Sequence, residues 1–364
     1  MAAPLRYGII GTGMMGVEHI TNLLHLDGAI VTAISDPNAT SRDWAQVAVG
    51  LNAQLQRFDH HRELLDAAVC DAVVIASPNF THHDVLLDVL RTNHHVMVEK
   101  PLCTTISDCY DVIDLAEESA RRWPQRVVWM GLEYRYMPPT QAVLDEVRAG
   151  TVGEVRMVAI REHRFPFLTK VDNWNRFTRN TGGTLVEKCC HFFDLMNLLV
   201  GSPPRRVMAS GGQDHNHLDE RYNDETPDIL DNAYVIVEYD GGVRAMLDLC
   251  MFAEASRNEQ EISVVGRIGK IEALVTEGIL RTGLRSNGIG RTTERRITDD
   301  AIRHKGMHHG ASYLEHVAFR DAIVGGLPAT VTLHDGLASV AVGQAAHLSI
   351  ERGMPVEIAE VLKR

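Results

Sequence analysis

Residues 7–16, with the sequence YGIIGTGMMG, carry a short apolar segment directly into a glycine-rich turn. The amphipathic residues 15–26 follow, and a second apolar segment, AIVTAISD, occupies residues 29–36. Apolar strands that alternate with amphipathic helices indicate a parallel sheet covered by helices on both faces. The first part of the chain therefore predicts an α/β fold.

The same alternation continues to about residue 128. Apolar runs at residues 71–78 (DAVVIASP) and 94–101 (HHVMVEKP) are separated by the amphipathic residues 81–93. We therefore predict that residues 1–130 form an α/β domain of the Rossmann type, which is built on a doubly wound parallel sheet.

Beyond residue 130 the pattern changes. Residues 152–165 (VGEVRMVAIREHRF) alternate apolar and polar side chains, and residues 232–252 contain an Asp-Gly turn between two similar runs. Such alternation indicates antiparallel strands with one covered face. We predict that residues 131–364 form an α+β domain with a large, mostly antiparallel open sheet. Whether its C-terminal helices pack back on the first domain stays open.

The composition favours a small-molecule partner. The 364 residues are 45% hydrophobic and carry a formal net charge of -12, which disfavours nucleic acid or an anionic membrane as the main partner. No apolar run is long enough to span a membrane, and the first residues lack the pattern of a signal peptide. The six cysteines include no C-x-x-C pair. We therefore expect a protein of the reducing cytoplasm.

The glycine turn predicts a dinucleotide site. Gly11 permits the tight turn, Gly13 lets the backbone approach a pyrophosphate, and Gly16 permits close packing of the helix. Asp36 follows twenty positions after Gly16, where a carboxylate accepts hydrogen bonds from a ribose 2′-OH. No arginine directly follows Asp36, so NAD is favoured over NADP. We expect cofactor contacts from Gly11, Thr12, Gly13, Met14, Met15, Gly16 and Asp36.

Two further segments follow strands at the same predicted edge of the sheet. They are Ser77-Pro78-Asn79 with His82, and Glu99-Lys100-Pro101. Taken alone, Glu99-Lys100-Pro101 is typical of a strand-to-turn junction with a solvated lysine. At this edge, a lysine beside a cationic nicotinamide has its pKa lowered and suits proton exchange. From these segments we expect cofactor contacts from Ser77, Pro78, Asn79, His82, Glu99 and Lys100.

These motifs, with G-G-x-x-x-E-x-x-x-H-x-x-D at residues 182–194, resemble the Gfo/Idh/MocA oxidoreductases. The resemblance implies NAD(H) or NADP(H) in the first domain, a sugar or cyclitol substrate, and dimers or tetramers that pair through the second domain. It also implies a catalytic set of Lys100, position 187 and His191. Here Glu187 stands where the family has Asp, and Cys189 where Gly is usual.

Residues 182–197 allow several interpretations. On one α-helix, Glu187, His191 and Asp194 share a face that can look into a cleft. Zinc typically needs three or four ligands, and no second ligand cluster accompanies Glu187, Cys190 and His191, so we expect no metal. A disulfide between adjacent cysteines is strained, which favours core packing of both thiols. We expect His191 to be the base, Lys100 to bind the same oxygen, and Glu187 to orient or tune Lys100 and the substrate.

The substrate signal is weaker. Basic and aromatic side chains gather before and around residues 182–197. They form either a solvated charged surface or a binding site for a sugar ring with an anionic substituent. The expected substrate residues are Arg135, Tyr136, Arg164, Trp174, Arg176 and Asp194.

Three functions fit these residues. The first is an NAD-dependent dehydrogenase that acts on a ring secondary alcohol of a sugar, glycoside or cyclitol. The second is implied by the resemblance, since some relatives act as glycosidases that keep their NAD, oxidise C3 transiently, eliminate the aglycone, add water and reduce again. An anionic glycoside such as a sulfoquinovoside suits this second function. The third is a non-catalytic regulator that senses the dinucleotide.

Overall fold

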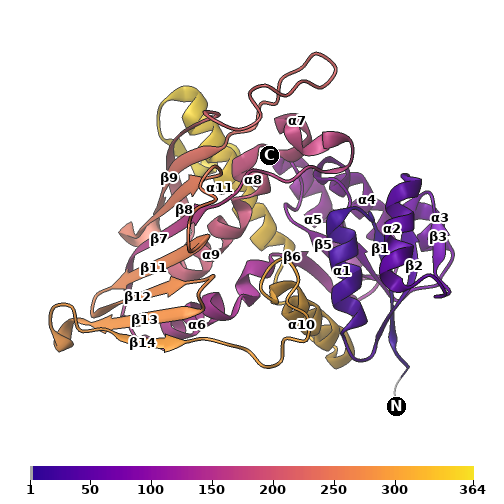
Figure 1. Ribbon diagram of the computed structural model, residues 1–364, viewed down its shortest axis with the longest axis horizontal. Helices are drawn as coiled ribbons and strands as arrows, with labels where there is room; N and C mark the ends of the chain where they lie inside the picture. Colours follow the sequence, from indigo (N-terminus) through magenta and orange to yellow (C-terminus); the bar gives the residue numbers. More distant parts are fainter. Residues whose placement is uncertain (1–2) are drawn as a thin grey trace. The chain divides into compact units, whose positions relative to one another are not determined.

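The computed structural model describes residues 3–364, which form two compact units (Figure 1). Unit 1 contains the residues up to Glu133, together with Lys170–Trp174 and Asp300–Leu337. Unit 2 contains Tyr134–Thr169, Asn175–Asp299 and Ala338–Arg364. The predicted division into domains of residues 1–130 and 131–364 stays a prediction.

Within the described residues, unit 1 is built on a six-stranded sheet in the order β3-β2-β1-β4-β5-β6. All its pairings are parallel, which confirms the predicted parallel α/β fold. The strand order reverses at β1, and ligands of such sheets bind at that reversal. The strands are β1 (Leu5–Ile10), β2 (Ala29–Ser35), β3 (Gln56–Phe58), β4 (Ala72–Ile75), β5 (His95–Glu99) and β6 (Val128–Gly131). The helices are α1 (Met14–Leu24), α2 (Ala39–Val49), α3 (His61–Asp66), α4 (His82–Val89), α5 (Ile106–Ala120) and α10 (Ala311–Gly325).

Helix α10 joins the core of unit 1 although about half the length of the chain separates it from β6. Its Phe319 packs against the rings of Tyr7 in β1 and Trp129 in β6. The Trp129 indole N–H donates to Glu315 at 3.2 Å. Because all four side chains are buried, the indole finds its acceptor inside the core, as a buried tryptophan requires.

Unit 2 contains, in the part of the chain that the structure describes, a nine-stranded sheet in the order β14-β13-β12-β11-β7-β10-β9-β8-β15. Only β7 and β10 pair in parallel, so the predicted mostly antiparallel sheet is confirmed. The strands are β7 (Val155–His163), β8 (Pro204–Gly212), β9 (Asn232–Tyr239), β10 (Arg244–Cys250), β11 (Gln260–Gly266), β12 (Gly269–Leu274), β13 (Ile279–Leu284), β14 (Thr293–Arg296) and β15 (Val356–Glu357). The helices are α6 (Pro138–Arg148), α7 (Thr178–Thr181), α8 (Thr184–Glu187), α9 (Cys190–Val200) and α12 (Ile358–Val361), and α11 (Leu333–Arg352) continues from unit 1.

The two faces of this sheet differ. Helices α6 and α9 contact each other and cover one face, where Val158 and Ile160 of β7 are buried (Figure 1). Alternate residues point to the other face, and there the apolar side chains stay exposed. Met208, Ile236 and Met246 lie side by side across β8, β9 and β10. The exposed apolar residues of this open face are Met157, Met208, Tyr234, Ile236 and Met246.

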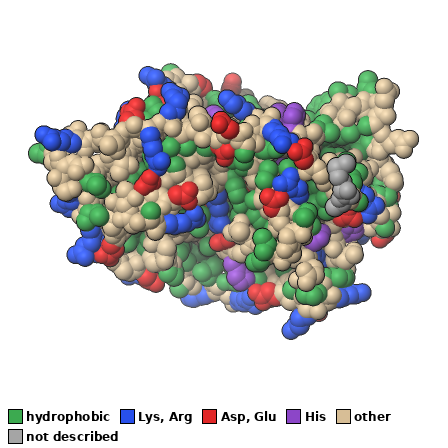
Figure 2. Space-filling view, turned by 90° about the horizontal axis from the view of Figure 1, so that it is seen from below, with side chains coloured by type: hydrophobic (Ala, Val, Ile, Leu, Met, Phe, Trp, Pro, Cys, Tyr) green, Lys and Arg blue, Asp and Glu red, His purple; other side chains and the backbone are tan. Residues whose placement is uncertain are grey.

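The surface carries charges of both signs. Figure 2 shows one face of the molecule, on which Lys and Arg side chains lie interspersed with Asp and Glu. Among residues 3–364, no helix combines the length and the apolar composition that crossing a bilayer requires.

Candidate functional site

The glycine turn after β1 fits a pyrophosphate. Gly11 has a positive φ of 88°, and a Cβ built there would lie 2.4 Å from the Ser77 nitrogen. A Cβ on Gly16 would lie 2.1 Å from the Gly11 oxygen, whereas the space around Gly13 is open. Helix α1 begins at Met14 without a side-chain cap. Its first N–H groups therefore suit an anion that approaches past Gly13.

Asp36 lies beside this turn, directly after β2. Its Oδ2 accepts a hydrogen bond from the Thr12 N–H at 2.7 Å, and its Oδ1 accepts one from the Asn38 N–H at 2.8 Å. Arg42 donates to the Asp36 carbonyl and pairs with Asp59 at 2.8 Å. The guanidinium of Arg42, the first arginine after Asp36 in sequence, is thus already engaged, which suits a ribose diol at Asp36 better than a phosphate.

His82 joins the loops that follow β4 and β5. Its Nδ1 lies 2.8 Å from the Pro101 carbonyl oxygen and its Nε2 lies 3.1 Å from the Ser77 carbonyl oxygen. Burial lowers the pKa of His82, although both carbonyls oppose that shift. A neutral ring carries a single N–H and donates to only one of these two carbonyls, so His82 lies against both loops and hydrogen-bonds one of them. Pro78 and Asn79 lie between Ser77 and His82 in sequence.

Lys100 follows β5, where a buried ion pair supports its backbone. Glu99 Oε1 lies 2.8 Å from His19 Nε2, and Glu99 Oε2 accepts the Lys100 backbone N–H at 3.1 Å. The second ring nitrogen of His19 lies 2.9 Å from Nε2 of His316 in α10. Burial disfavours both charges, but the bond between them raises the pKa of His19 and lowers that of Glu99. The contact between the two side chains therefore favours their ionised forms.

The predicted single helix over residues 182–197 is wrong, because it is divided into α8 and α9. Lys188 stands between them and Cys189 caps α9. The N–H groups of Phe192 and Phe193 both reach the Cys189 carbonyl at 3.0 Å, which tightens the first turn of α9. Gly183 precedes the break, and a Cβ on it would lie 2.3 Å from Nε2 of His347.

Glu187, His191 and Asp194 are all buried in unit 2. The His191 imidazole stacks on the Tyr134 ring, with centroids 3.9 Å apart and planes 5° from parallel. Asp194 receives the Arg135 guanidinium, with Nε to Oδ2 at 2.7 Å and Nη2 to Oδ1 at 2.5 Å. Two residues predicted for substrate binding thus form a bidentate pair.

Lys188 and Glu162 are buried polar residues that the sequence interpretation missed. Lys188 Nζ lies 2.8 Å from Glu162 Oε1 and donates to the Tyr134 hydroxyl at 2.8 Å. Burial raises the pKa of Glu162 and lowers that of Lys188. The sequence did hold a signal: Glu162 continues the inward positions of Val158 and Ile160, and Lys188 interrupts an apolar segment.

The remaining predicted substrate residues have protein partners. Arg164 Nε lies 3.2 Å from a Glu259 oxygen, and Arg176 Nε lies 2.8 Å from a Glu220 oxygen. Trp174 belongs to unit 1, where it meets the edge of Phe80 at 6.4 Å. Tyr136 is half-buried. The two arginines therefore carry compensated charges.

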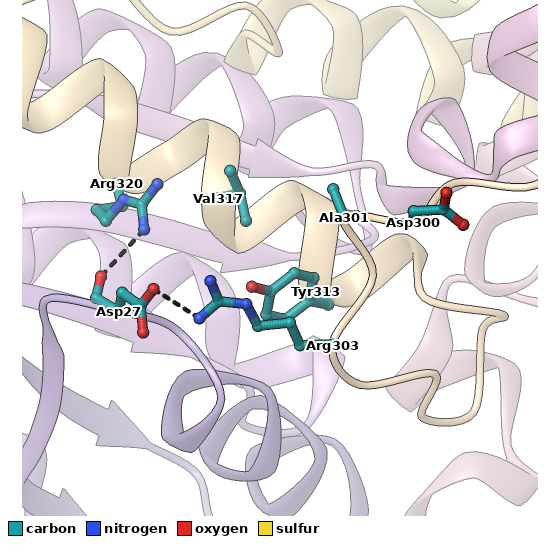
Figure 3. A pocket seen from close by; sticks show the side chains of 7 residues that line it. All are labelled: Asp27, Asp300, Ala301, Arg303, Tyr313, Val317 and Arg320. Atoms are coloured by element: carbon teal, nitrogen blue, oxygen red, sulfur yellow. Dashed lines mark hydrogen bonds and ion pairs between the residues drawn. The ribbon is translucent and has the colours of Figure 1, made fainter.

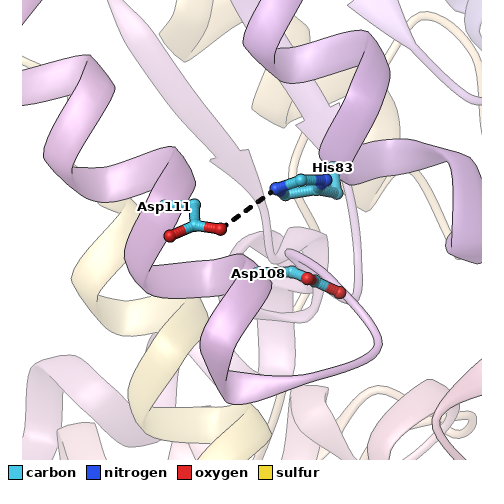
Figure 4. A group of neighbouring side chains, drawn as sticks. All are labelled: His83, Asp108 and Asp111. Atoms are coloured by element: carbon cyan, nitrogen blue, oxygen red, sulfur yellow. Dashed lines mark ion pairs between the residues drawn. The ribbon is translucent and has the colours of Figure 1, made fainter. Parts of the chain in front are cut away.

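The cysteines of the segment pack in the core. Cys189 and Cys190 are both buried, and neither is part of a disulfide. Within residues 3–364, the group of side chains close enough to hold a metal ion lies elsewhere, at His83 of α4 with Asp108 and Asp111 of α5 (Figure 4). His83 faces Asp111 at 3.5 Å, and Asp111 is exposed.

Unit 1 also has a hollow beside α10 that contains none of the predicted site residues (Figure 3). Two arginines converge there on Asp27: Arg303 pairs with its carboxylate at 2.6 Å, and Arg320 donates to its carbonyl at 3.0 Å. The lining residues are Asp27, Asp300, Ala301, Arg303, Tyr313, Val317 and Arg320.

Comparison with known proteins gives full-length relatives. The chain is 26% identical over 360 residues to myo-inositol 2-dehydrogenase of Thermotoga maritima, which covers 98% of this chain and 100% of that protein. It is 25% identical over 363 residues to scyllo-inositol 2-dehydrogenase (NAD(+)) of Bacillus subtilis, with 98% and 97% covered. The crystal structure of scyllo-inositol dehydrogenase from Lactobacillus casei, with bound NAD(H) and scyllo-inositol, has a TM-score of 0.79 at 19% identity and covers 98% of this chain and 99% of that one.

Two family models divide the chain between them. Residues 5–124 match the NAD-binding Rossmann fold of the oxidoreductase family, and residues 145–358 match its C-terminal alpha/beta domain. The glycine turn, Asp36 and Lys100 all fall in the first match. The protein is thus an oxidoreductase with an NAD-binding domain, and the chain belongs to the Gfo/Idh/MocA family.

Proposed function

We propose that the protein is an NAD-dependent dehydrogenase that oxidises a secondary alcohol on the ring of a cyclitol, sugar or glycoside. The observation that carries the proposal lies at the carboxyl edge of the unit 1 sheet. There the glycine turn after β1 and Lys100 after β5 flank the loop that follows β4. Ligands of open α/β sheets bind at this edge, and a lysine beside them suits proton chemistry.

The relatives support the substrate class. The curated relatives from Thermotoga maritima and Bacillus subtilis carry the names of inositol 2-dehydrogenases. A cyclitol and a pyranose present the same chemical group, a ring CH–OH between two similar carbons. We therefore place cyclitols first among the substrates to be tested, with sugars and glycosides beside them.

The reaction needs a proton acceptor and a stabiliser of charge on oxygen. We assign the proton acceptor to His191, and to Lys100 a hydrogen bond that stabilises the same oxygen as its proton leaves. To Glu187 we assign the orienting or tuning of Lys100 and the substrate. Bound NAD supplies the acceptor for the hydride that leaves the carbinol carbon. The alcohol thus loses a proton and a hydride and becomes a ketone.

Substrate contacts are assigned to the residues predicted for them, with a division of roles. Arg135 and Asp194 hold each other, so each offers its remaining hydrogen-bonding capacity to a hydroxyl. Arg164 and Arg176 are compensated by glutamates, which favours neutral ring hydroxyls over a strongly anionic substituent. Tyr136 and Trp174 supply aromatic surface of the kind that packs on a sugar ring.

A turnover assay with NAD tests the proposal. The panel contains myo-inositol, scyllo-inositol, free sugars and glycosides, including a sulfoquinovoside, and the assay measures NADH, ketone and released aglycone. Equal amounts of NADH and ketone would support it. Aglycone release without accumulated NADH would overturn it in favour of a redox-neutral glycoside hydrolase, and NAD binding without either product would identify a dinucleotide sensor.

We also propose that the open face of unit 2 pairs with a second copy of the chain. Its apolar row crosses adjacent strands, and exposed apolar surface of this kind marks interfaces. Met208→Glu and Met246→Glu should shift sedimentation towards the monomer, and unchanged sedimentation would contradict the proposal. None of the six cysteines of the described chain is part of a disulfide, which accords with the proposed location in a reducing cytoplasm.

A further inference from the structure

The His191 ring rests on a tyrosine that is itself anchored. Tyr134 stacks on His191 with ring centroids 3.9 Å apart, and Phe192 meets Tyr134 edge-on at 5.7 Å. At its far end, the Tyr134 hydroxyl accepts a hydrogen bond from Lys188 Nζ at 2.8 Å. His191 and Tyr134 are both buried. The plane of the imidazole therefore depends on where the phenol ring is held.

Lys188 is anchored in turn by a carboxylate on the sheet. Glu162 near the end of β7 is fully buried and lies 2.8 Å from Lys188 Nζ. Arg164 lies 3.6 Å from the same Glu162 oxygen. Because burial raises the pKa of Glu162 and lowers that of Lys188, keeping this pair charged opposes folding rather than favouring it.

Because burial disfavours the charges of Glu162 and Lys188, a contribution to stability does not explain why the protein has these two residues in its core. An apolar pair of the same volume would often stabilise a core as well or better. It would not, however, hold the hydroxyl end of Tyr134. A base must lie within hydrogen-bond reach of the proton it removes, and a misplacement of about 1 Å costs on the order of 100-fold in rate.

We propose that Glu162 and Lys188 are positioning residues, which fix Tyr134 by its hydroxyl and, through the stacked ring, fix the imidazole of His191. The link runs from β7 through Lys188, at the junction of α8 and α9, to Tyr134 in the short turn before α6. The effect on turnover rests on the proposed role of His191. The effect on ring geometry does not.

The test compares three variants of the full chain. Tyr134→Phe keeps the ring and removes the hydroxyl. Lys188→Met/Glu162→Gln removes both charges and leaves no lone buried ion. Lys270→Met is the matched control, because Lys270 forms its 2.6 Å pair with Glu272 on the exposed surface of the same unit.

The first measurement is an NMR spectrum of the histidine ring protons in the protein without substrate, with the His191 signals assigned by their loss in His191→Gln. A parallel stack at 3.9 Å places these protons in the ring current of Tyr134 and moves their signals upfield. We expect both test variants to move the His191 signals downfield and Lys270→Met to leave them unchanged. His191 signals identical to wild type in both test variants would overturn the proposal.

The second measurement separates kcat from the KM for NAD. We expect both test variants to lose about 10- to 100-fold in kcat, as for a displaced base, with the KM for NAD unchanged. An unchanged kcat with moved signals would overturn the link to turnover. If His191→Gln itself keeps full activity while the signals still move, the proposed function fails and the ring-positioning inference stands.

Discussion

Each unit buries an ion pair behind a residue proposed for the reaction, and the two pairs differ in their response to burial. In unit 1, the bond between His19 and Glu99 outweighs burial, so the pKa of His19 is raised and that of Glu99 is lowered. In unit 2, burial outweighs the attraction, so the pKa of Glu162 is raised and that of Lys188 is lowered. The interaction within the first pair stabilises the charged forms of its side chains, whereas burial of the second pair destabilises the charged forms.

The difference follows from the partners of each pair. Both oxygens of Glu99 accept hydrogen bonds, one from His19 and one from the backbone of Lys100. Lys188 instead faces a second cation, Arg164, whose charge lowers the pKa of Lys188 beyond the effect of burial. A buried charge is thus stabilised when its hydrogen-bonding positions are all occupied. One opposite charge alone does not achieve this.

The largest expected effect is on stability, when one member of the unit 2 pair is removed. Lys188→Met leaves the Glu162 carboxylate buried without its ammonium, which should lower the free energy of unfolding by about 3–5 kcal/mol. The double variant Lys188→Met/Glu162→Gln leaves no lone charge and should lose much less. Urea unfolding measures both, and equal losses in the two variants would break the comparison.

The next effect is on turnover. His191→Ala removes the proposed proton acceptor and should lower kcat at least about 100-fold, the lower range for a general base. NAD binding, measured by calorimetry, should stay as in wild type because the dinucleotide turn lies in unit 1. Near-normal turnover would show that His191 is not the proton acceptor. The stacking of Tyr134 on His191 would then have no role in turnover.

A smaller effect, dependent on pH, should come from the unit 1 pair. Because the folded-state pKa of His19 is raised, its contribution is fully present below its ordinary pKa of 6.5 and is lost as pH rises through the raised value. The lowered pKa of Glu99 gives a contribution that is present above its ordinary 4.5 and is lost as pH falls through the lowered value.

Urea unfolding of wild type and His19→Gln at a series of pH values checks this expectation. We expect wild type to be more stable by about 2 kcal/mol while both groups are charged, and the two curves to approach each other at alkaline pH. A difference that does not change with pH would show that the pair is not ionised, and the contrast with unit 2 would disappear.

The smallest effect concerns the cofactor. Asp36→Ala removes the acceptor proposed for the ribose diol and should weaken NAD binding about tenfold, in the range of one hydrogen bond to a charged group. NADP binding should improve relative to NAD, because the carboxylate no longer repels a phosphate. Titration with both dinucleotides measures the ratio, and an unchanged ratio would remove Asp36 from cofactor selection.

The sequence predicts what depends on local pattern. The alternation of apolar segments and helices gives the parallel sheet of unit 1, and the period-two pattern of residues 152–165 gives a strand of the open sheet. The glycine turn is predicted for the same reason: Gly11 and Gly16 each meet a backbone atom too closely for a Cβ. The apolar periods and the spacing of the glycines are local patterns, although the backbone atom that Gly11 meets belongs to the distant Ser77.

The features that the sequence does not predict depend on contacts between residues that lie far apart in the chain. His19 and His316 are 297 positions apart, so no spacing rule joins them. Lys188 and Glu162 come from a helix junction and a strand, and only the packed sheet brings them together. The division of the segment into α8 and α9 was missed because its apolar residues fit an unbroken helical period equally well.

The open face of unit 2 has a chemical consequence of its own. Met157, Met208 and Met246 present thioethers at 57%, 49% and 39% exposure, whereas Met97 and Met196 are sealed in the interior. Oxidation converts such a side chain into a polar sulfoxide, so dilute peroxide would modify this surface before it reaches the core. Covering by a second copy would slow that modification, and the sulfoxide pattern would then record whether the face is covered.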